Sequence, residues 1–374
     1  MTIPVISLVM PCFNRAYDLL KVLRAYDSQN GEEPFELIAV DDGSSDATYD
    51  VLVAYKPVRY TLRVERLEKN QGQGLARNHA IPLVNSPLLL FAQDDMVPSP
   101  DFVHGHLEAH RQHPEKETAI LGRVEWPQDI PQNTLMKHID GLGAQQFSYY
   151  YLRDGQEYDF RHFYTCNISV KSGFIRSLDH WFDRGFYLYG FEDAELGYRL
   201  KQRGLHIVYS QKMVVQHYHY HNIWTFARRQ RNCGIMANVL IAKHPKLVYF
   251  FRGFYFRVLT LLKHVQNPFS SFPAETLEQL EMLACRISGF YEWDANSLLD
   301  GLYIAVLDYF FYDGFIQGLF SSSKVGQHLR LTNGREYLVP ALLSFIKNAE
   351  SVGIPVPGGE HALLARKIIE LNSE

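Results

Sequence analysis

The chain has 374 residues, a net charge of −4 and a hydrophobic share of 47%, which fit one large or two smaller globular domains. The negative charge argues against a nucleic-acid-binding protein, because contacts to phosphates need a basic surface. The four cysteines are widely spaced and form no CxxC pair, which predicts reduced thiols. We recognise no signal peptide after Met1 and expect a cytoplasmic location.

The chain contains no run of roughly 18–20 uninterrupted apolar residues, the length that a membrane-spanning helix needs. Residues 247–263 combine many aromatic side chains with Arg252, Arg257 and Lys263, a mixture that also occurs in helices lying on membranes. A core helix in an aromatic-rich accessory region is the alternative. We therefore expect either a core helix or a peripheral contact of this segment with the cytoplasmic face of a membrane.

Predicted strands and helices alternate along the first hundred residues. Apolar runs predict strands at 5–10, 36–40, 60–67 and 87–91. Helical spacing predicts helices at 14–29 and 71–84, with Asn14 capping the first. This order of βαβ units predicts an α/β fold, with a mainly parallel central sheet flanked by helices.

The later part of the chain is less regular. Further strands are predicted at 118–124 and 165–170, short extended pieces at 206–210 and 213–217, and a helix at 192–202 that Gly204 ends. After about residue 222 helical spacing dominates. We expect one domain at 1–245 and a helical C-terminal region at 246–374.

Polar residues follow three of the predicted strands, where parallel sheets bind their ligands. Asp94 and Asp95 directly follow the fourth apolar run, and adjacent carboxylates there repel each other and resist loss of water. A divalent cation would remove both costs, and oxygen ligands suit Mg²⁺ or Mn²⁺, which in turn hold phosphates. A solvated turn is the alternative, which Pro98, Ser99 and Pro100 favour.

Five motifs occur in a fixed order within residues 3–245: PCFNR at 11–15, VDDGSSD at 40–46, GLARN at 74–78, the acid pair at 94–95 and GFED at 190–193. In order and spacing they resemble the nucleotide-sugar glycosyltransferases of family 2, which have the GT-A fold. The resemblance implies an inverting, metal-assisted transfer from a nucleotide-diphospho-sugar, with a UDP-sugar favoured. The acceptor would be a saccharide, a lipid-linked molecule or a protein, in polysaccharide or glycoconjugate synthesis.

The resemblance also implies residues that bind the donor nucleotide. Asp41 would accept an N–H of a uracil or guanine base, and the backbone around Pro11 and Phe13 would flank that base. Asn14 belongs to the same nucleotide-binding loop. Arg77 carries a rigid fork of donors that suits a phosphate or a base, and a helix-surface ion pair is its alternative role.

The acid pair resembles the DXD motif of the family, with one departure. Gln93 stands where the first Asp of that motif usually lies, although its amide can still hydrogen-bond a ribose or a phosphate. In the family the last acid of the motif binds the metal. The resemblance therefore implies Asp95 as a ligand of Mn²⁺ or Mg²⁺ and Asp94 as a contact of the ribose or a second contact at the same site.

His217, His219 and His221 alternate after a predicted strand, and three imidazoles so close together are also compatible with zinc. Several GT-A enzymes complete the metal site with one histidine at this place. The resemblance therefore implies His217, which closes the strand, as the second metal ligand. The other two are expected to be ordinary surface histidines.

Glu192 and Asp193 begin a predicted helix, where the helix dipole stabilises acids by ~0.3–1 kcal/mol, so simple capping is an alternative. An inverting transfer needs a general base that takes the proton of the attacking hydroxyl. The family uses the Asp of this pair, which implies Asp193 as the base and Glu192 as a ligand of acceptor hydroxyls. Asn167, on the strand before this helix, would contact the donor sugar or the acceptor.

Two other classes of protein compete with this interpretation. A nucleotidyltransferase would be expected to carry a Gly-rich triphosphate loop with Arg and Lys, and residues 10–15 contain only Arg15. A non-catalytic nucleotide-sugar-binding or scaffold subunit on a degenerate transferase fold is favoured by Gln93. The three acids Asp94, Asp95 and Asp193 argue against it.

Overall fold

The computed structural model describes residues 3–141, 146–244 and 246–247, with scattered helical positions between 300 and 318. The chain divides into two compact units, which we describe separately. The first comprises Met1–Pro131, Phe147–Tyr187 and Glu192–His219, and the second Gln132–Gln146, Leu188–Phe191 and Tyr220–Glu374. The domain boundary expected near residue 245 stays a prediction. The segment 247–263 lies, apart from Leu247, outside the described residues.

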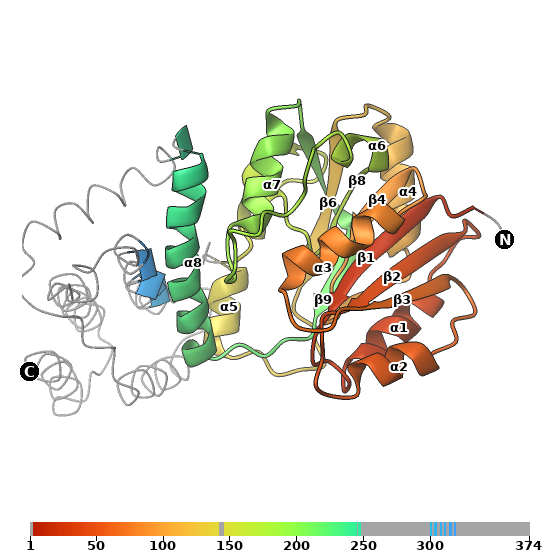
Figure 1. The fold of residues 1–374 in the computed structure, drawn as a ribbon, viewed down its shortest axis with the longest axis horizontal. Helices are drawn as coiled ribbons and strands as arrows, with labels where there is room; N and C mark the ends of the chain where they lie inside the picture. Colours follow the sequence, from red (N-terminus) through yellow and green to blue (C-terminus); the bar gives the residue numbers. More distant parts are fainter. Residues whose placement is uncertain are drawn as a thin grey trace, which may run out of the picture. The chain divides into compact units, whose positions relative to one another are not determined.

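The first unit is built on one mixed sheet with the strand order β3-β2-β1-β4-β8-β6-β9-β5, and β7 pairs with β9 (Figure 1). The strands are β1 Ile6–Cys12, β2 Phe35–Asp41, β3 Thr61–Arg66, β4 Leu88–Phe91, β5 Met96–Pro98, β6 Thr118–Glu125, β7 Glu157–Tyr158, β8 Ile168–Lys171 and β9 His206–His217. The strands β3, β2, β1 and β4 are parallel, as are β6 and β9, whereas β8, β5 and β7 pair antiparallel. The expected α/β fold is confirmed.

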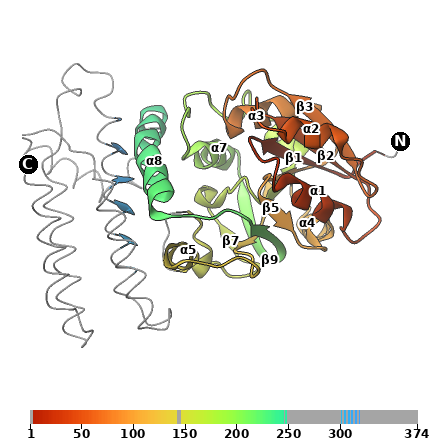
Figure 2. The same ribbon diagram turned by 90° about the horizontal axis from the view of Figure 1, so that it is seen from below.

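Helices pack on this sheet because its central strands are apolar on both faces. Every residue of β1 is buried, which is typical of a parallel strand covered on both sides. α3 packs against β1 and β2, α4 against β6 and β9, and α1 beside β5 (Figure 2). The helices are α1 Leu19–Asp27, α2 Thr48–Ala54, α3 Gln73–Ala80, α4 Phe102–Gln112, α6 Ser172–Ile175 and α7 Glu192–Lys201, with short 3₁₀ turns at Ile81–Leu83, Tyr149–Tyr151 and Phe160–His162.

The first helix begins later than predicted. Asn14 does not cap it, because its backbone is left-handed with φ 52° and its Oδ1 accepts from Ser45 N at 2.9 Å. Asn14 N in turn donates to Ser44 Oγ at 3.0 Å. The side chain thus joins the loop after β1 to the loop after β2, and α1 starts at Leu19.

The two extended pieces predicted before the histidines form one strand, β9. Its register against β6 shifts, since Leu121 pairs with Tyr209 and Arg123 with Val214. Such a shift bends a strand and turns its end. The end of β9 then runs antiparallel to β5, where His217 pairs with Met96.

In the second unit, α5 (Thr134–Asp140) and α8 (Ile223–Lys243) each begin at an asparagine that caps them. Asn133 Oδ1 accepts from Met136 N and Asn222 Oδ1 from Thr225 N, both at 2.9 Å. The buried His138 of α5 contacts Asp300 through Nδ1 and Oδ1 at 2.6 Å. Among the described residues, no helix is both long and apolar enough to cross a membrane.

Candidate metal and catalytic site at the sheet edge

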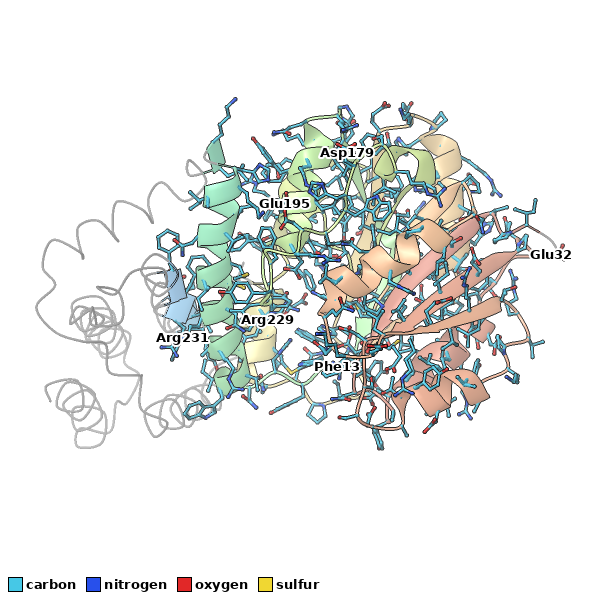
Figure 3. All side chains as sticks on the ribbon, in the orientation of Figure 1. Phe13, Glu32, Asp179, Glu195, Arg229 and Arg231 are labelled. Carbon is cyan, nitrogen blue, oxygen red and sulfur yellow. The ribbon has the colours of Figure 1, made fainter. Side chains whose placement is uncertain are left out.

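The carboxyl ends of β1, β2 and β4 meet at one edge of the sheet in the first unit. Parallel pairing sets Cys12 beside Asp41 and Val9 beside Phe91, so the residues that follow these strands emerge together. Figure 3 shows Phe13 at this edge, directly after β1, and Glu195 on α7. The predicted convergence of polar residues on one edge is therefore present.

Three side chains at this edge could hold a metal ion together. One ligand atom each of Asp95, His217 and His219 lies within 4.8 Å of the other two. Asp95 Oδ2 is 3.5 Å from His217 Nε2 and 3.4 Å from His219 Nδ1. The hydrogen bond from Tyr218 N to Asp95 O, 2.8 Å long, fixes the chain between the histidines. Sequence reasoning missed His219, although its alternation with His217 was the signal.

Arg15 reaches the same group of atoms. Its Nη2 donates to Asp95 Oδ2 at 2.8 Å and lies 3.1 Å from His219 Nδ1, while its Nε is 3.7 Å from Asp94 Oδ1. Burial alone would raise the pKa of Asp95, but His217, His219 and Arg15 hold that pKa well below its usual range. Burial and the charge of Asp95 raise the pKa of Asp94 to about 7. The pKa values of the two neighbouring acids are therefore shifted in opposite directions.

The nucleotide-binding residues expected from the sequence lie in loops that hold one another. Asp94 Oδ2 accepts from Phe13 N at 3.1 Å. Asp41 is fully buried, accepts from Ser44 N at 3.3 Å and pairs with Arg66 Nε at 3.1 Å. The loops after β1, β2 and β4 are thus joined by polar contacts. The predicted roles of Pro11, Phe13, Asn14, Asp41 and Asp94 stay predictions.

Arg77 is more buried than expected for a residue that contacts a nucleotide or forms an ion pair on the surface of a helix. It is fully buried, its Nη2 donates to Thr165 O at 2.9 Å, and its guanidinium carbon lies 5.6 Å from the ring centre of Phe182. Burial lowers its pKa, and the charge of Asp193 opposes that change. Nε and Nη1 have no hydrogen-bond partner among the described residues. The helix-surface ion pair is wrong for Arg77, and the nucleotide contact stays a prediction.

The two acids of α7 are held by other side chains of the first unit. Asp193 Oδ1 accepts from Thr165 Oγ1 at 2.7 Å, and its Oδ2 accepts from Thr165 N at 3.2 Å. Glu192 Oε1 accepts from Gln73 Nε2 at 2.6 Å. Both carboxylates are therefore fixed in direction before any substrate arrives. Neither Thr165 nor Gln73 was identified as part of the site from the sequence.

Asn167 is buried in the core and uses its whole amide there. Its Oδ1 faces His106 Nε2 at 3.0 Å, and its Nδ2 donates to Arg123 O and Met213 O, both at 3.0 Å. A Cβ added at Gly122 would meet this amide at 2.5 Å, so the packing around it is close. The predicted contact of Asn167 with a sugar stays a prediction, and this burial does not favour it.

Comparison with known proteins gives a family model and several relatives. Residues 7–179 match the model described as glycosyl transferase family 2. The uncharacterized glycosyltransferase YfnE of Bacillus subtilis is 28% identical over 242 residues, 53% of this chain and 61% of that protein. Validoxylamine A glucosyltransferase of Streptomyces hygroscopicus subsp. jinggangensis is 28% identical over 247 residues, 56% of this chain and 54% of that protein. The chain thus spans less than two thirds of the length of these relatives.

Among solved structures, TarS 1–349 of S. aureus is 17% identical with a TM-score of 0.48, covering 84% of this chain and 89% of that chain.

Proposed function

We propose that the chain is an inverting glycosyltransferase that uses a nucleotide-diphospho-sugar, because residues 7–179 match the glycosyl transferase family 2 model and contain four of the five motifs. Its mixed, mostly parallel sheet is the GT-A fold that the family implies. The observation that carries the proposal is the cluster of Asp95, His217 and His219 at the sheet edge of the first unit.

The donor set of this cluster fits a divalent cation. One carboxylate and two imidazoles offer three ligand atoms within 4.8 Å of one another. Of the two ions expected from the sequence, Mn²⁺ is favoured over Mg²⁺, because Mg²⁺ is usually held by oxygen ligands and this cluster contains two imidazoles. When bound, the ion would neutralise charge that develops on the departing diphosphate. Arg15 already contacts two of the three ligand residues and would share that electrostatic role.

The acids of α7 supply the proton chemistry in this proposal. Asp193 takes the proton of the acceptor hydroxyl while that hydroxyl attacks the anomeric carbon, and Thr165 keeps the carboxylate oriented through two hydrogen bonds. Glu192 binds a hydroxyl of the acceptor. No covalent intermediate is needed, because direct displacement inverts the anomeric centre.

The nucleotide in this proposal is a uridine diphosphate. The buried carboxylate of Asp41 ends β2 at the same edge and is a suitable acceptor for the N–H of uracil. A relative named as a glucosyltransferase favours a hexose as the transferred sugar. The acceptor is a saccharide, a lipid-linked molecule or a protein. A cytoplasmic location, and contact of residues 247–263 with a membrane, also belong to the proposal.

A panel of nucleotide sugars tests the proposed function. We expect one UDP-sugar to raise the melting temperature of the wild type with Mn²⁺ and to be slowly hydrolysed. Asp95→Ala should lose both effects, whereas Asp50→Asn, a change at an exposed acid of α2, should keep them. Binding without hydrolysis or transfer would favour the non-catalytic subunit. If no member of the panel stabilises the wild type at millimolar concentration, the transferase proposal is wrong.

A further inference from the structure

Gln93 stands where family 2 usually has an acid, and its amide takes part in a series of two hydrogen bonds. Its Nε2 donates to Gln73 Oε1 at 3.1 Å, and Gln73 Nε2 donates to Glu192 Oε1 at 2.6 Å. Gln93 follows β4, Gln73 is the first residue of α3, and Glu192 is the first residue of α7. The series therefore joins the strand end that carries the acid pair to the acidic start of α7.

Chemistry fixes the direction of both hydrogen bonds. An ionised carboxylate has no proton to donate, so Gln73 must turn its NH₂ group toward Glu192. The carbonyl oxygen of Gln73 then faces Gln93 and needs a donor. An amide at position 93 supplies that donor, whereas an ionised acid offers only acceptors.

An acid at position 93 would break the series at one of two points. Its oxygen would oppose the carbonyl of Gln73, or Gln73 would turn over and place its carbonyl against Glu192. Glu192 is only 7% exposed, and Gln73 and Gln93 are partly buried, so water compensates poorly for a lost hydrogen bond. The acid would also add a third carboxylate next to Asp94 and Asp95.

The backbone that carries Gln73 is itself held in place. Asp42 accepts from Gln71 N and from Gly72 N, both at 2.8 Å. Gly72 has φ 91°, a conformation that side chains other than hydrogen rarely adopt, and α3 starts directly after it. Gln73 therefore cannot shift freely to compensate for a change at either of its partners.

We propose that Gln93 is a positioning residue that acts through Gln73 on the carboxylate of Glu192. The carbonyl oxygen of Gln73 needs a hydrogen-bond donor, and the amide of Gln93 supplies it where the family usually has an acid. The inference deepens the proposed function and rests on it, since Glu192 is assigned there to an acceptor hydroxyl. It makes acceptor binding, rather than donor binding, depend on residue 93.

Two substitutions at position 93 distinguish the effect of the hydrogen-bond donor from the effect of the side chain's shape. Gln93→Met keeps the length and removes the donor, and Gln93→Glu keeps the shape and presents only acceptors. With the most active acceptor from a panel of mono- and oligosaccharides as the probe, both should lower kcat/KM for that saccharide about tenfold, the effect of one lost hydrogen bond in a series that ends on a charged group. The dissociation constant of UDP with Mn²⁺ should change less than about twofold.

Gln112→Met is the matched control. Gln112 Nε2 donates to Glu108 Oε1 at 3.0 Å on the exposed side of α4, the same kind of contact outside the site. This variant should match the wild type in acceptor and donor kinetics.

The decisive arm repeats Gln93→Met in a Glu192→Met background, which removes the acceptor of the Gln73 hydrogen bond. If Gln93 acts through Glu192, the second change costs less than about twofold there, because the group it positions is absent. A full tenfold loss in that background overturns the inference. Unchanged acceptor kinetics in both single variants overturn it as well.

A second cycle, in the free energy of unfolding, needs no substrate. Gln93→Met and Gln73→Met should be non-additive, because each removes the same hydrogen bond. Additive effects would contradict the series of contacts. A wild type that neither binds UDP nor transfers a sugar contradicts the proposed function, and the unfolding cycle then still decides whether the series exists.

Discussion

Two pairs of closely spaced histidines in the first unit have different surroundings in the structure. His217 and His219 lie at the sheet edge with their ring nitrogens 3.5 and 3.4 Å from Asp95 Oδ2. His106 and His110 lie one helical turn apart on α4 and are buried. Their nitrogens are 2.8 and 2.9 Å from the hydroxyl of Ser169, and no carboxylate hydrogen-bonds to either of them among the described residues.

The difference shows that the neighbours of a histidine, and not its spacing, decide its role. Burial lowers the pKa of His106 to about 4, and burial together with Lys171 lowers the pKa of His110 to about 2. Both imidazoles are therefore neutral and connect α4 to β8 through Ser169 and Asn167. At the sheet edge, the carboxylate of Asp95 makes the pair His217 and His219 attractive to a cation. Changes at the edge should cost function, and changes in the core should cost stability.

The largest expected effect is at the edge. Asp193→Asn removes the proposed general base and should lower the transfer rate by about 10²–10⁴-fold. The affinity for UDP with Mn²⁺ should stay close to that of the wild type, as it should in Asp50→Asn. A loss of UDP affinity equal to the loss of rate would instead assign Asp193 to donor binding.

The matching change in the core is Asn167→Leu. It removes the amide that contacts His106, Arg123 and Met213, and we expect a loss of ~2–4 kcal/mol in the free energy of unfolding. Denaturant titration measures that loss, and UDP binding by the folded fraction should persist. Full stability combined with a raised KM for donor or acceptor would support the sugar contact predicted from the sequence.

A smaller effect is expected for His219→Ala, which tests a ligand that sequence reasoning missed. Removing one of three candidate ligands should weaken Mn²⁺ binding by roughly 10–100-fold, a loss that calorimetry measures. His104→Ala is the control, since His104 is a half-exposed histidine on α4 that contacts Glu33. Equal Mn²⁺ affinity in the two variants would remove His219 from the site.

The smallest effect is on the pH dependence of stability. The pKa of His106 is lower in the folded chain than the ordinary value near 6.5, so the unfolded chain binds more protons below that pH. The contribution of His106 is complete above about pH 6.5 and should be lost at up to ~1.4 kcal/mol per pH unit as pH falls toward 4. Unfolding of His106→Gln between pH 5 and 7 should show a flatter dependence. An unchanged slope would mean that His106 is not held neutral.

Much of the fold could be predicted, because short apolar runs that are followed by polar residues indicate strands and where they end. The apolar runs predicted the first four strands, and their parallel order brought residues after β1, β2 and β4 to one edge. The start of α1 could not be predicted, because the left-handed backbone of Asn14 depends on Ser45 in a distant loop. The local sequence shows a residue that could cap the helix, but it does not show that Ser45 binds the same side chain.

Of the residues expected at the site, Asp95 and His217 lie together in the structure, and their roles stay predictions. His219 joins them from beyond the end of β9, and its alternation with His217 was the signal for it. Gln73 and Thr165 carry no charge that would mark them, and their roles come from contacts between separate elements. Such contacts are products of the tertiary fold.

Calorimetric titration of UDP into the wild type, with Mn²⁺ and then with a chelator, tests the central claim most directly. The claim is that the strand-end acids and histidines hold a metal that binds the diphosphate of the donor. We predict measurable UDP binding with Mn²⁺ and a loss of at least about tenfold in affinity with the chelator. Equal affinity for UDP under both conditions would contradict the claim.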